Sequence, residues 1–320
     1  MIGGILALVF VCVLAVVAVG QRAKEDCDAI FKSQEELDAH IENEHSPPPP
    51  PPKLEIPVLG DYTNQGVRHG ITGRTMIPQL MSALKQMGVR DYMHNVWKYS
   101  HMWDDFKLLA PECQKAGIRL WLYNVPPSEP PAPKPFEQDY IRWAREVALL
   151  MVKYPVIQGM LMDDFNGNTS YFTIAKCQQI IDAGRAIAPN FKFIPVAYMG
   201  HDSIYRLEPH IQAGVCDALL LVYWWPWKDP LKTDALRPQI EEYRAWIDRH
   251  SPNRRVPFLP FIVAWRGGGR KEPTPAYVQK ALQICMTAYK DGLIEGMATY
   301  VLPKDNPEFI EAMASVYKEI

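Results

Sequence analysis

The feature that most constrains the fold is a regular alternation of short apolar runs with amphipathic runs, beginning near Glu55 and continuing to the end of the chain. Eight apolar runs have the length and composition of strands: Ile56–Tyr62, Asp91–Trp97, Ile118–Val125, Val156–Phe165, Phe193–Met199, Ala218–Trp225, Pro257–Trp265 and Gly296–Leu302. Eight amphipathic runs follow them and are typical of helices: Met76–Met87, Asp104–Ala116, Phe136–Lys153, Tyr171–Ile187, Ser203–Ala213, Thr233–His250, Pro275–Lys290 and Pro307–Lys318.

Eight strand–helix units in this order predict an α/β fold, the (β/α)8 TIM barrel, in which parallel strands close into a cylinder inside a ring of helices. The chain has 320 residues, of which 48% are hydrophobic, so it can bury one large core of this kind. A doubly wound open sheet is the alternative, but the glycine-rich first turn that usually accompanies it is absent. We assign residues 54–320 to the barrel.

The residues before the barrel predict an anchor, a short helical segment and a stalk. Residues 2–19 are apolar and long enough to cross a membrane, so residues 1–20 are expected to form a transmembrane anchor or a signal segment. We therefore expect the protein to be membrane-anchored or secreted, with the side of the membrane left open. Residues 47–53 include six consecutive prolines, which favour an extended polyproline linker.

Residues 21–46 resemble a degenerate zinc finger. Cys27, His40 and His45 have the spacing of the last three ligands of a two-Cys, two-His finger, but Lys24 stands where the first cysteine is required. A structural zinc site normally has four protein ligands. We therefore favour a short capped helix without metal and keep zinc binding by these three residues as the weaker alternative.

The charge distribution argues against nucleic acid as a partner. The formal net charge is −2, and the basic residues form no long block. The six cysteines contain no closely spaced pair, so a disulfide framework is not expected. No cofactor is expected, and the oligomeric state is left open.

In a barrel the functional site lies at the carboxyl ends of the strands, and these ends carry acids, amides and large rings. Such a mixture suits a carbohydrate, because sugar rings offer C–H faces to aromatic rings and hydroxyls to polar groups. Trp97, Trp121 and Trp143 are expected in the core instead. The candidate substrate-binding residues are Asp61, Tyr62, Asn95, Tyr123, Asn124, Tyr198, Trp225, Trp265 and Tyr300.

The end of the fourth strand carries two adjacent acids, in the segment Gly159-Met160-Leu161-Met162-Asp163-Asp164-Phe165. A buried strand that runs into paired acids is costly unless the acids emerge into a polar cleft. This segment resembles the Asp-Asp motif of barrel glycoside hydrolases that use substrate-assisted catalysis, nearest to glycoside hydrolase family 84. The resemblance covers about ten residues.

The resemblance implies a glycosidase in which Asp163 orients the acetamido group of the substrate and Asp164 is the general acid/base. Repulsion between neighbouring acids raises one apparent pKa, which suits a proton donor. Tyr223 would then hydrogen-bond the developing oxazoline oxygen, and Trp225 or Trp265 would lie under the sugar ring. A carbohydrate is the expected partner.

Three alternatives remain open. In the second glycosidase hypothesis, Asp61 faces Asp163 or Asp164 across the mouth in a conventional two-carboxylate mechanism. The glycine-rich segment Arg266–Lys271 could bind phosphate in a lyase or isomerase. The barrel could also bind glycans, or serve as a scaffold, without catalysis.

Overall fold

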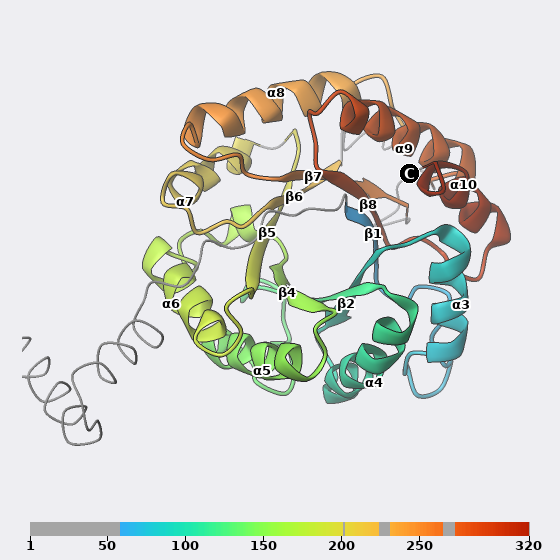
Figure 1. The fold of residues 1–320 in the computed structure, drawn as a ribbon, viewed down its shortest axis with the longest axis horizontal. Coiled ribbons are helices and arrows are strands. Elements are labelled where there is room, and N and C mark those ends of the chain that lie inside the picture. The colour runs from blue at the N-terminus through green and yellow to red at the C-terminus, as the bar shows by residue number, and fades with distance from the viewer. Residues whose placement is uncertain (1–57, 201, 224–230, 265–272, 320) are drawn as a thin grey trace, which may run out of the picture. The chain divides into compact units, whose positions relative to one another are not determined.

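In the computed structural model the strands close into a complete parallel barrel (Figure 1). The structure describes residues 58–200, 202–223, 231–264 and 273–319, which all belong to the second of the two units of the chain, Met1–Pro50 and Pro51–Ile320. The strands are β1 (Val58–Tyr62), β2 (Asp91–Val96), β3 (Arg119–Asn124), β4 (Ile157–Met162), β5 (Lys192–Tyr198), β6 (Leu219–Tyr223), β7 (Phe258–Val263) and β8 (Gly296–Tyr300). Each strand pairs with its neighbours in sequence, and β1 pairs with β8. The barrel prediction is confirmed.

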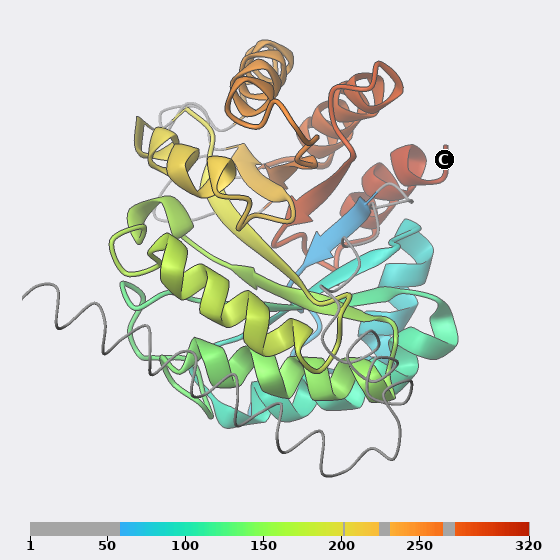
Figure 2. The same cartoon turned by 60° about the vertical axis from the view of Figure 1, so that its left-hand side comes forward.

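Within the described residues, helical structure follows every strand and lies outside the ring (Figures 1 and 2). The α-helices are α3 (Ile77–Met87), α4 (Ser100–Ala116), α5 (Tyr140–Lys153), α6 (Ile174–Arg185), α7 (Glu208–Gln212), α8 (Leu236–His250), α9 (Pro275–Lys290) and α10 (Pro307–Tyr317). Short 3-10 helices occupy Phe165–Gly167 after β4 and Asp202–Leu207 after β5.

The helix predicted over Ser203–Ala213 is divided into a 3-10 helix and the short helix α7. Pro209 lies in the first turn of α7. Proline has no N–H to donate and its ring clashes with the preceding turn, so it is tolerated at the start of a helix but not inside one. The proline therefore sets the point at which the helix begins again.

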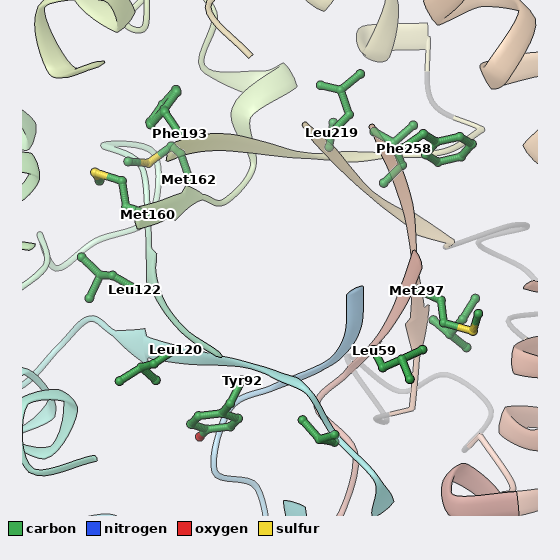
Figure 3. Close-up of a cluster of buried hydrophobic side chains, with 14 of the residues drawn as sticks. Leu59, Tyr92, Leu120, Leu122, Met160, Met162, Phe193, Leu219, Phe258 and Met297 are labelled. Carbon is green, nitrogen blue, oxygen red and sulfur yellow. The ribbon is translucent and has the colours of Figure 1, made fainter. Parts of the chain in front are cut away.

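Alternate residues of each strand point to two different cores. Figure 3 shows Leu120 and Leu122 directed outward, where they belong to the cluster between strands and helices. Trp121 and Tyr123 point inward and belong to a second cluster that fills the barrel. This period of two is the geometry of any strand, and it decides which strand-end residues can reach the barrel mouth.

The first and last strands are joined by buried polar contacts. The Lys304 Nζ lies 2.7 Å from the Asp61 Oδ2, and both side chains are fully buried. The Thr299 hydroxyl donates to the Asp61 Oδ1 over 2.8 Å. The Tyr317 hydroxyl, from α10, donates to the Gly60 carbonyl over 2.9 Å. These contacts fasten the closing seam of the barrel.

The predictions for residues 1–53 lie outside the described residues, as do Cys27, His40, His45 and the six prolines. They stay predictions. In the part of the chain that the structure describes, no helix has the length and hydropathy required to cross a membrane.

Candidate active site

A cavity of about 360 Å³ opens at the carboxyl end of the barrel. Its walls come from the ends of β1, β2, β4, β5 and β8 and from the loops after β1, β2 and β3. Five predicted site residues line it, namely Tyr62, Asn95, Asp163, Tyr198 and Tyr300. The other lining residues are Thr63, Gln65, Arg68, Gly73, Trp97, Lys98, Tyr99, His101, Met102, Val125, Glu129 and Val301.

The alternation along β4 brings Asp163 into the cavity. Met160 and Met162 point outward (Figure 3), and Leu161 points into the barrel. The backbone N–H of Asp163 still donates to a carbonyl of β3, over 2.9 Å, so the alternation extends one residue further and directs its side chain inward. Asp163 is buried.

Asp164 precedes the 3-10 helix after β4 and has a left-handed backbone conformation, φ 42° and ψ 33°. Its backbone N–H donates to the Asp163 Oδ1 over 2.9 Å. Thr63 and Val301, which follow β1 and β8, also have positive φ, of 64° and 58°. Such conformations are strained for residues with a Cβ and are common near functional sites. Here they occur at three strand ends around one cavity.

Glu129 is a third acid at this site, and sequence reasoning missed it. Its carboxyl group lies within hydrogen-bonding reach of that of Asp164. The search for acids was confined to residues directly at strand ends, whereas Glu129 lies in the long proline-rich loop between β3 and α5. A long loop at the functional face of a barrel, stiffened by prolines and carrying one acid, is the signal that could have found it.

Two side chains, Trp97 and Asn168, hold the Glu129 loop in place. The Trp97 indole N–H donates to the Glu129 carbonyl over 3.2 Å and to that of Pro131 over 2.8 Å. The Asn168 amide donates to the Ser128 hydroxyl and to the Asp164 carbonyl, both over 2.9 Å. Trp97 was expected in the core, but it lines the cavity and positions this loop.

Burial and the neighbouring acids raise the pKa of both Glu129 and Asp163. Burial, together with the hydrogen bond and negative charge of Asp164, raises the pKa of Glu129 from 4.5 to about 7, and Lys98 opposes the rise. Burial, followed by the charges of Asp164 and Glu129, raises the pKa of Asp163 well above its ordinary value. Neighbouring carboxyl groups cannot all ionise cheaply, so the site retains a proton near neutral pH.

Tyrosine rings form much of the wall beside these acids. The rings of Tyr62 and Tyr300 stack with centroids 5.0 Å apart, and Tyr123 packs on Tyr62 at 4.1 Å. The Tyr198 hydroxyl hydrogen-bonds Asp164. Tyr123 faces Asp163 and favours its ionised form, although its hydroxyl makes no hydrogen bond of regular geometry within the described residues. The wall thus offers apolar faces and hydroxyl groups together.

Asn95 offers a polar group to this cavity. Its amide nitrogen donates to the Tyr62 hydroxyl over 2.7 Å, which fixes the orientation of the amide. Its Oδ1 is buried and has no hydrogen-bond partner among the described residues. A buried acceptor without a partner is costly, so a ligand hydroxyl there would be stabilising.

Five described candidates do not line the cavity, namely Asp61, Tyr123, Asn124, Asp164 and Tyr223, and three of these point away from it. Asp61, Asn124 and Tyr223 each neighbour an inward-pointing residue on the same strand, so the alternation directs them outward. Asp61 is paired with Lys304, the Asn124 Oδ1 accepts the next backbone N–H, and the Tyr223 hydroxyl donates to the Lys232 carbonyl. The expected placement of these three at the mouth is wrong, because adjacent strand residues cannot both face inward. Trp225, Trp265 and Arg266–Lys271 lie outside the described residues.

Comparison with solved structures shows the same fold in carbohydrate-active enzymes. The "GH53 catalytic domain" of Ignisphaera aggregans matches with a TM-score of 0.58 at 13% identity, over 85% of this chain and 99% of that one. A glucosidase from Croceicoccus marinus matches with a TM-score of 0.59 at 9% identity, over 84% and 69%. The endo-beta-1,4-mannanase of Thermotoga petrophila matches with a TM-score of 0.52 at 10% identity, over 82% and 77%. At these identities the likeness shows the barrel fold alone.

No protein-family model matches the chain, and no curated protein matches it. The function therefore has to be argued from the cavity itself.

Proposed function

We propose that this barrel hydrolyses glycosidic bonds. The observation that carries the proposal is the contact between the carboxyl groups of Glu129 and Asp164, next to Asp163, at the end of β4. Glycosidases require a protonated acid at the leaving oxygen and a carboxylate or an acetamido group to support a cationic sugar centre. Acids beside tyrosine and tryptophan rings meet both this requirement and the stacking preference of sugar rings. The barrel fold shared with several glycosidases supports the same conclusion.

The proton donor in this proposal is the pair formed by Glu129 and Asp164. Glu129 has a pKa raised to about 7 and so retains its proton in neutral solution more readily than an ordinary carboxyl group. The Asp164 carboxyl group contacts Glu129 and helps to raise its pKa, and the Tyr198 hydroxyl orients Asp164. This replaces the simpler sequence hypothesis in which Asp164 alone is the acid/base.

Asp163 supports the positive charge that develops at the anomeric carbon. In the substrate-assisted route it accepts the acetamido N–H and directs the acetamido oxygen at that carbon, as the resemblance to family 84 implies. Tyr223 takes no part in this route, because it lies on the outer side of the barrel. In the direct route Asp163 acts on the carbon itself. A requirement for the acetamido group distinguishes the two.

The test is turnover of fluorogenic glycosides, with and without a 2-acetamido group, by the full-length chain. Glu129→Gln and Asp163→Asn should each reduce kcat/KM at least about 100-fold, the usual contribution of acid–base groups. The matched control is Asp182→Asn, which removes an exposed acid on α6 and should leave turnover unchanged. An active protein that loses nothing in Glu129→Gln would refute the assigned donor.

Absence of turnover on every sugar, with glycan binding retained, would favour a non-catalytic binding barrel. The phosphate hypothesis rests on Arg266–Lys271, outside the described residues, and the cavity gives it no separate support.

A further inference from the structure

Arg68 brings a fixed positive charge to the wall of the cavity. Its Nη2 donates to the Thr63 hydroxyl over 3.0 Å, and its Nε donates to the Asn64 Oδ1. The Asn64 amide in turn donates to the Thr75 hydroxyl over 2.6 Å. Both ends of the loop after β1 therefore hold the guanidinium in place, although its surface is exposed to solvent.

The charge of Arg68 is not neutralised within the described residues, where it forms no ion pair. Another arginine of the same loop, Arg74, shows the contrast: its Nε and Nη2 donate to the buried Asp105 carboxylate over 2.8 and 2.5 Å. A guanidinium has five N–H groups, of which Arg68 uses two in the contacts above. The remaining donors are available to a ligand.

Neither acid that lines the cavity pairs with Arg68 in the described residues: Glu129 contacts Asp164 and is affected by Lys98, and the Asp163 Oδ1 accepts the backbone N–H of Asp164. Tyr62 is sensitive to both groups: burial and Tyr300 chiefly raise its pKa, Asp163 and Glu129 add to the rise, and Arg68 opposes it. The cavity therefore has an acidic side at the end of β4 and a cationic side at the loop after β1. A neutral sugar would leave the cation unused, whereas a sugar with its own carboxylate would match both sides.

We propose that the glycan bound in this cavity carries a carboxylate, as in a uronic acid unit, and that Arg68 binds this group. The inference rests on the proposed glycosidase function, whose acids act on the glycosidic bond at the other side of the cavity. The planar guanidinium donates parallel N–H groups that match the two oxygens of a carboxylate. The cavity, at about 360 Å³, is at the small end of the range for ligand pockets. Because it leaves little room for a second sugar unit, we place the carboxylate on the same unit whose glycosidic bond lies beside the acids.

The experiment compares sugars that differ only at C6. Aryl glucuronides and galacturonides are assayed against the matching glucosides and galactosides, as both anomers, with the full-length chain. Binding of free glucuronate and galacturonate is measured by calorimetry against glucose and galactose. The variants are Arg68→Gln, Arg68→Lys and, as control, Arg145→Gln, which changes an exposed arginine of α5 away from the cavity.

Acidic sugars should be preferred, and Arg68→Gln should reduce that preference roughly 10- to 100-fold, mainly through KM, as expected for a lost charge-assisted hydrogen bond. Arg68→Lys should restore part of it, and Arg145→Gln should change nothing. Equal losses on acidic and neutral sugars, or a preference for neutral sugars, would overturn the inference while leaving the glycosidase intact.

If no sugar is hydrolysed, the binding arm still decides. Uronate binding that depends on Arg68 would support the carboxylate site and refute only the hydrolysis, whereas equal binding of acidic and neutral sugars would refute the site.

Discussion

The buried ion pair at the closing seam allows a prediction that needs no substrate. Asp61 and Lys304 have no exposed side-chain surface, and their charged atoms are 2.7 Å apart. Lys304→Met removes the cation and leaves Asp61 with the Thr299 hydroxyl as its remaining side-chain partner. An uncompensated buried charge typically costs about 3–5 kcal/mol. We expect the free energy of unfolding at pH 7 to fall by about that amount.

The sign of the pH dependence follows from the pKa of Asp61. Burial raises this pKa and Lys304 opposes the rise, so the variant has a still higher pKa in the folded state. The folded variant then binds a proton more strongly than the unfolded chain, whose Asp pKa is about 4. Asp61 of the folded wild type ionises at a lower pH than Asp61 of the variant, so the deficit of the variant relative to wild type should grow as pH rises above the wild-type pKa towards neutrality.

The assay is urea unfolding followed by tryptophan fluorescence at pH 4.5 and pH 7. The matched variant Asp61→Asn/Lys304→Met carries no charge at either position and should recover most of the loss, because a neutral buried pair no longer needs a cation. A loss below about 1 kcal/mol in Lys304→Met, or no recovery in the double variant, would show that the pair is not energetically coupled.

Three further predictions concern the rest of the barrel. The raised pKa of Glu129 means that wild type loses stability as this carboxyl group ionises between about pH 4.5 and 7, and Glu129→Gln should remove that loss. The variant should be more stable than wild type at pH 8 by about 1 kcal/mol, a value discounted for the partial exposure of Glu129. Urea midpoints at pH 5 and pH 8 measure the difference. Gly159→Ala should lower the melting temperature sharply, because φ is 143° and a Cβ would lie 2.0 Å from a carbonyl oxygen of β5. The control Gly167→Ala, which has open space around it, should not lower it, and equal shifts would contradict the packing argument. Asp105→Asn should weaken the interaction between this side chain and Arg74 by about 1.5–3 kcal/mol, and the loop after β1 should be cleaved faster in limited proteolysis. An unchanged digestion pattern would argue that Asp105 does not anchor the loop.

The sequence was sufficient to predict the fold because the strands and most of the helices follow a clear local periodicity. The predicted helix Pro275–Lys290 matches α9, and the predicted strand Gly296–Leu302 extends only two residues beyond β8. These elements have apolar faces with one period each and clear start and stop residues, such as the Thr274 cap of α9. Local patterns therefore fixed the order of elements, and the order fixed the barrel.

The site was predicted less completely, for two physical reasons. Tyr62, Asn95, Tyr198 and Tyr300 line the cavity, but Asp61, Asn124 and Tyr223 do not, because a shift of one residue along a strand reverses the side that a side chain faces. The position of Glu129 could not be predicted, because it depends on contacts between three loops through Trp97, Asn168 and Ser128. No local pattern in the sequence contains these contacts.

The contacts between the first and last strands also determine when the barrel can close during folding. Asp61 and Thr299 are 238 positions apart, and Gly60 and Tyr317 are 257 apart. On a ribosome, β1 would emerge long before β8 and α10 and would wait with one unpaired edge until almost the whole barrel sequence had been made. Closure of the barrel is then the last step of folding, and the β1 edge of a nascent chain can pair incorrectly until the last helix has been synthesised.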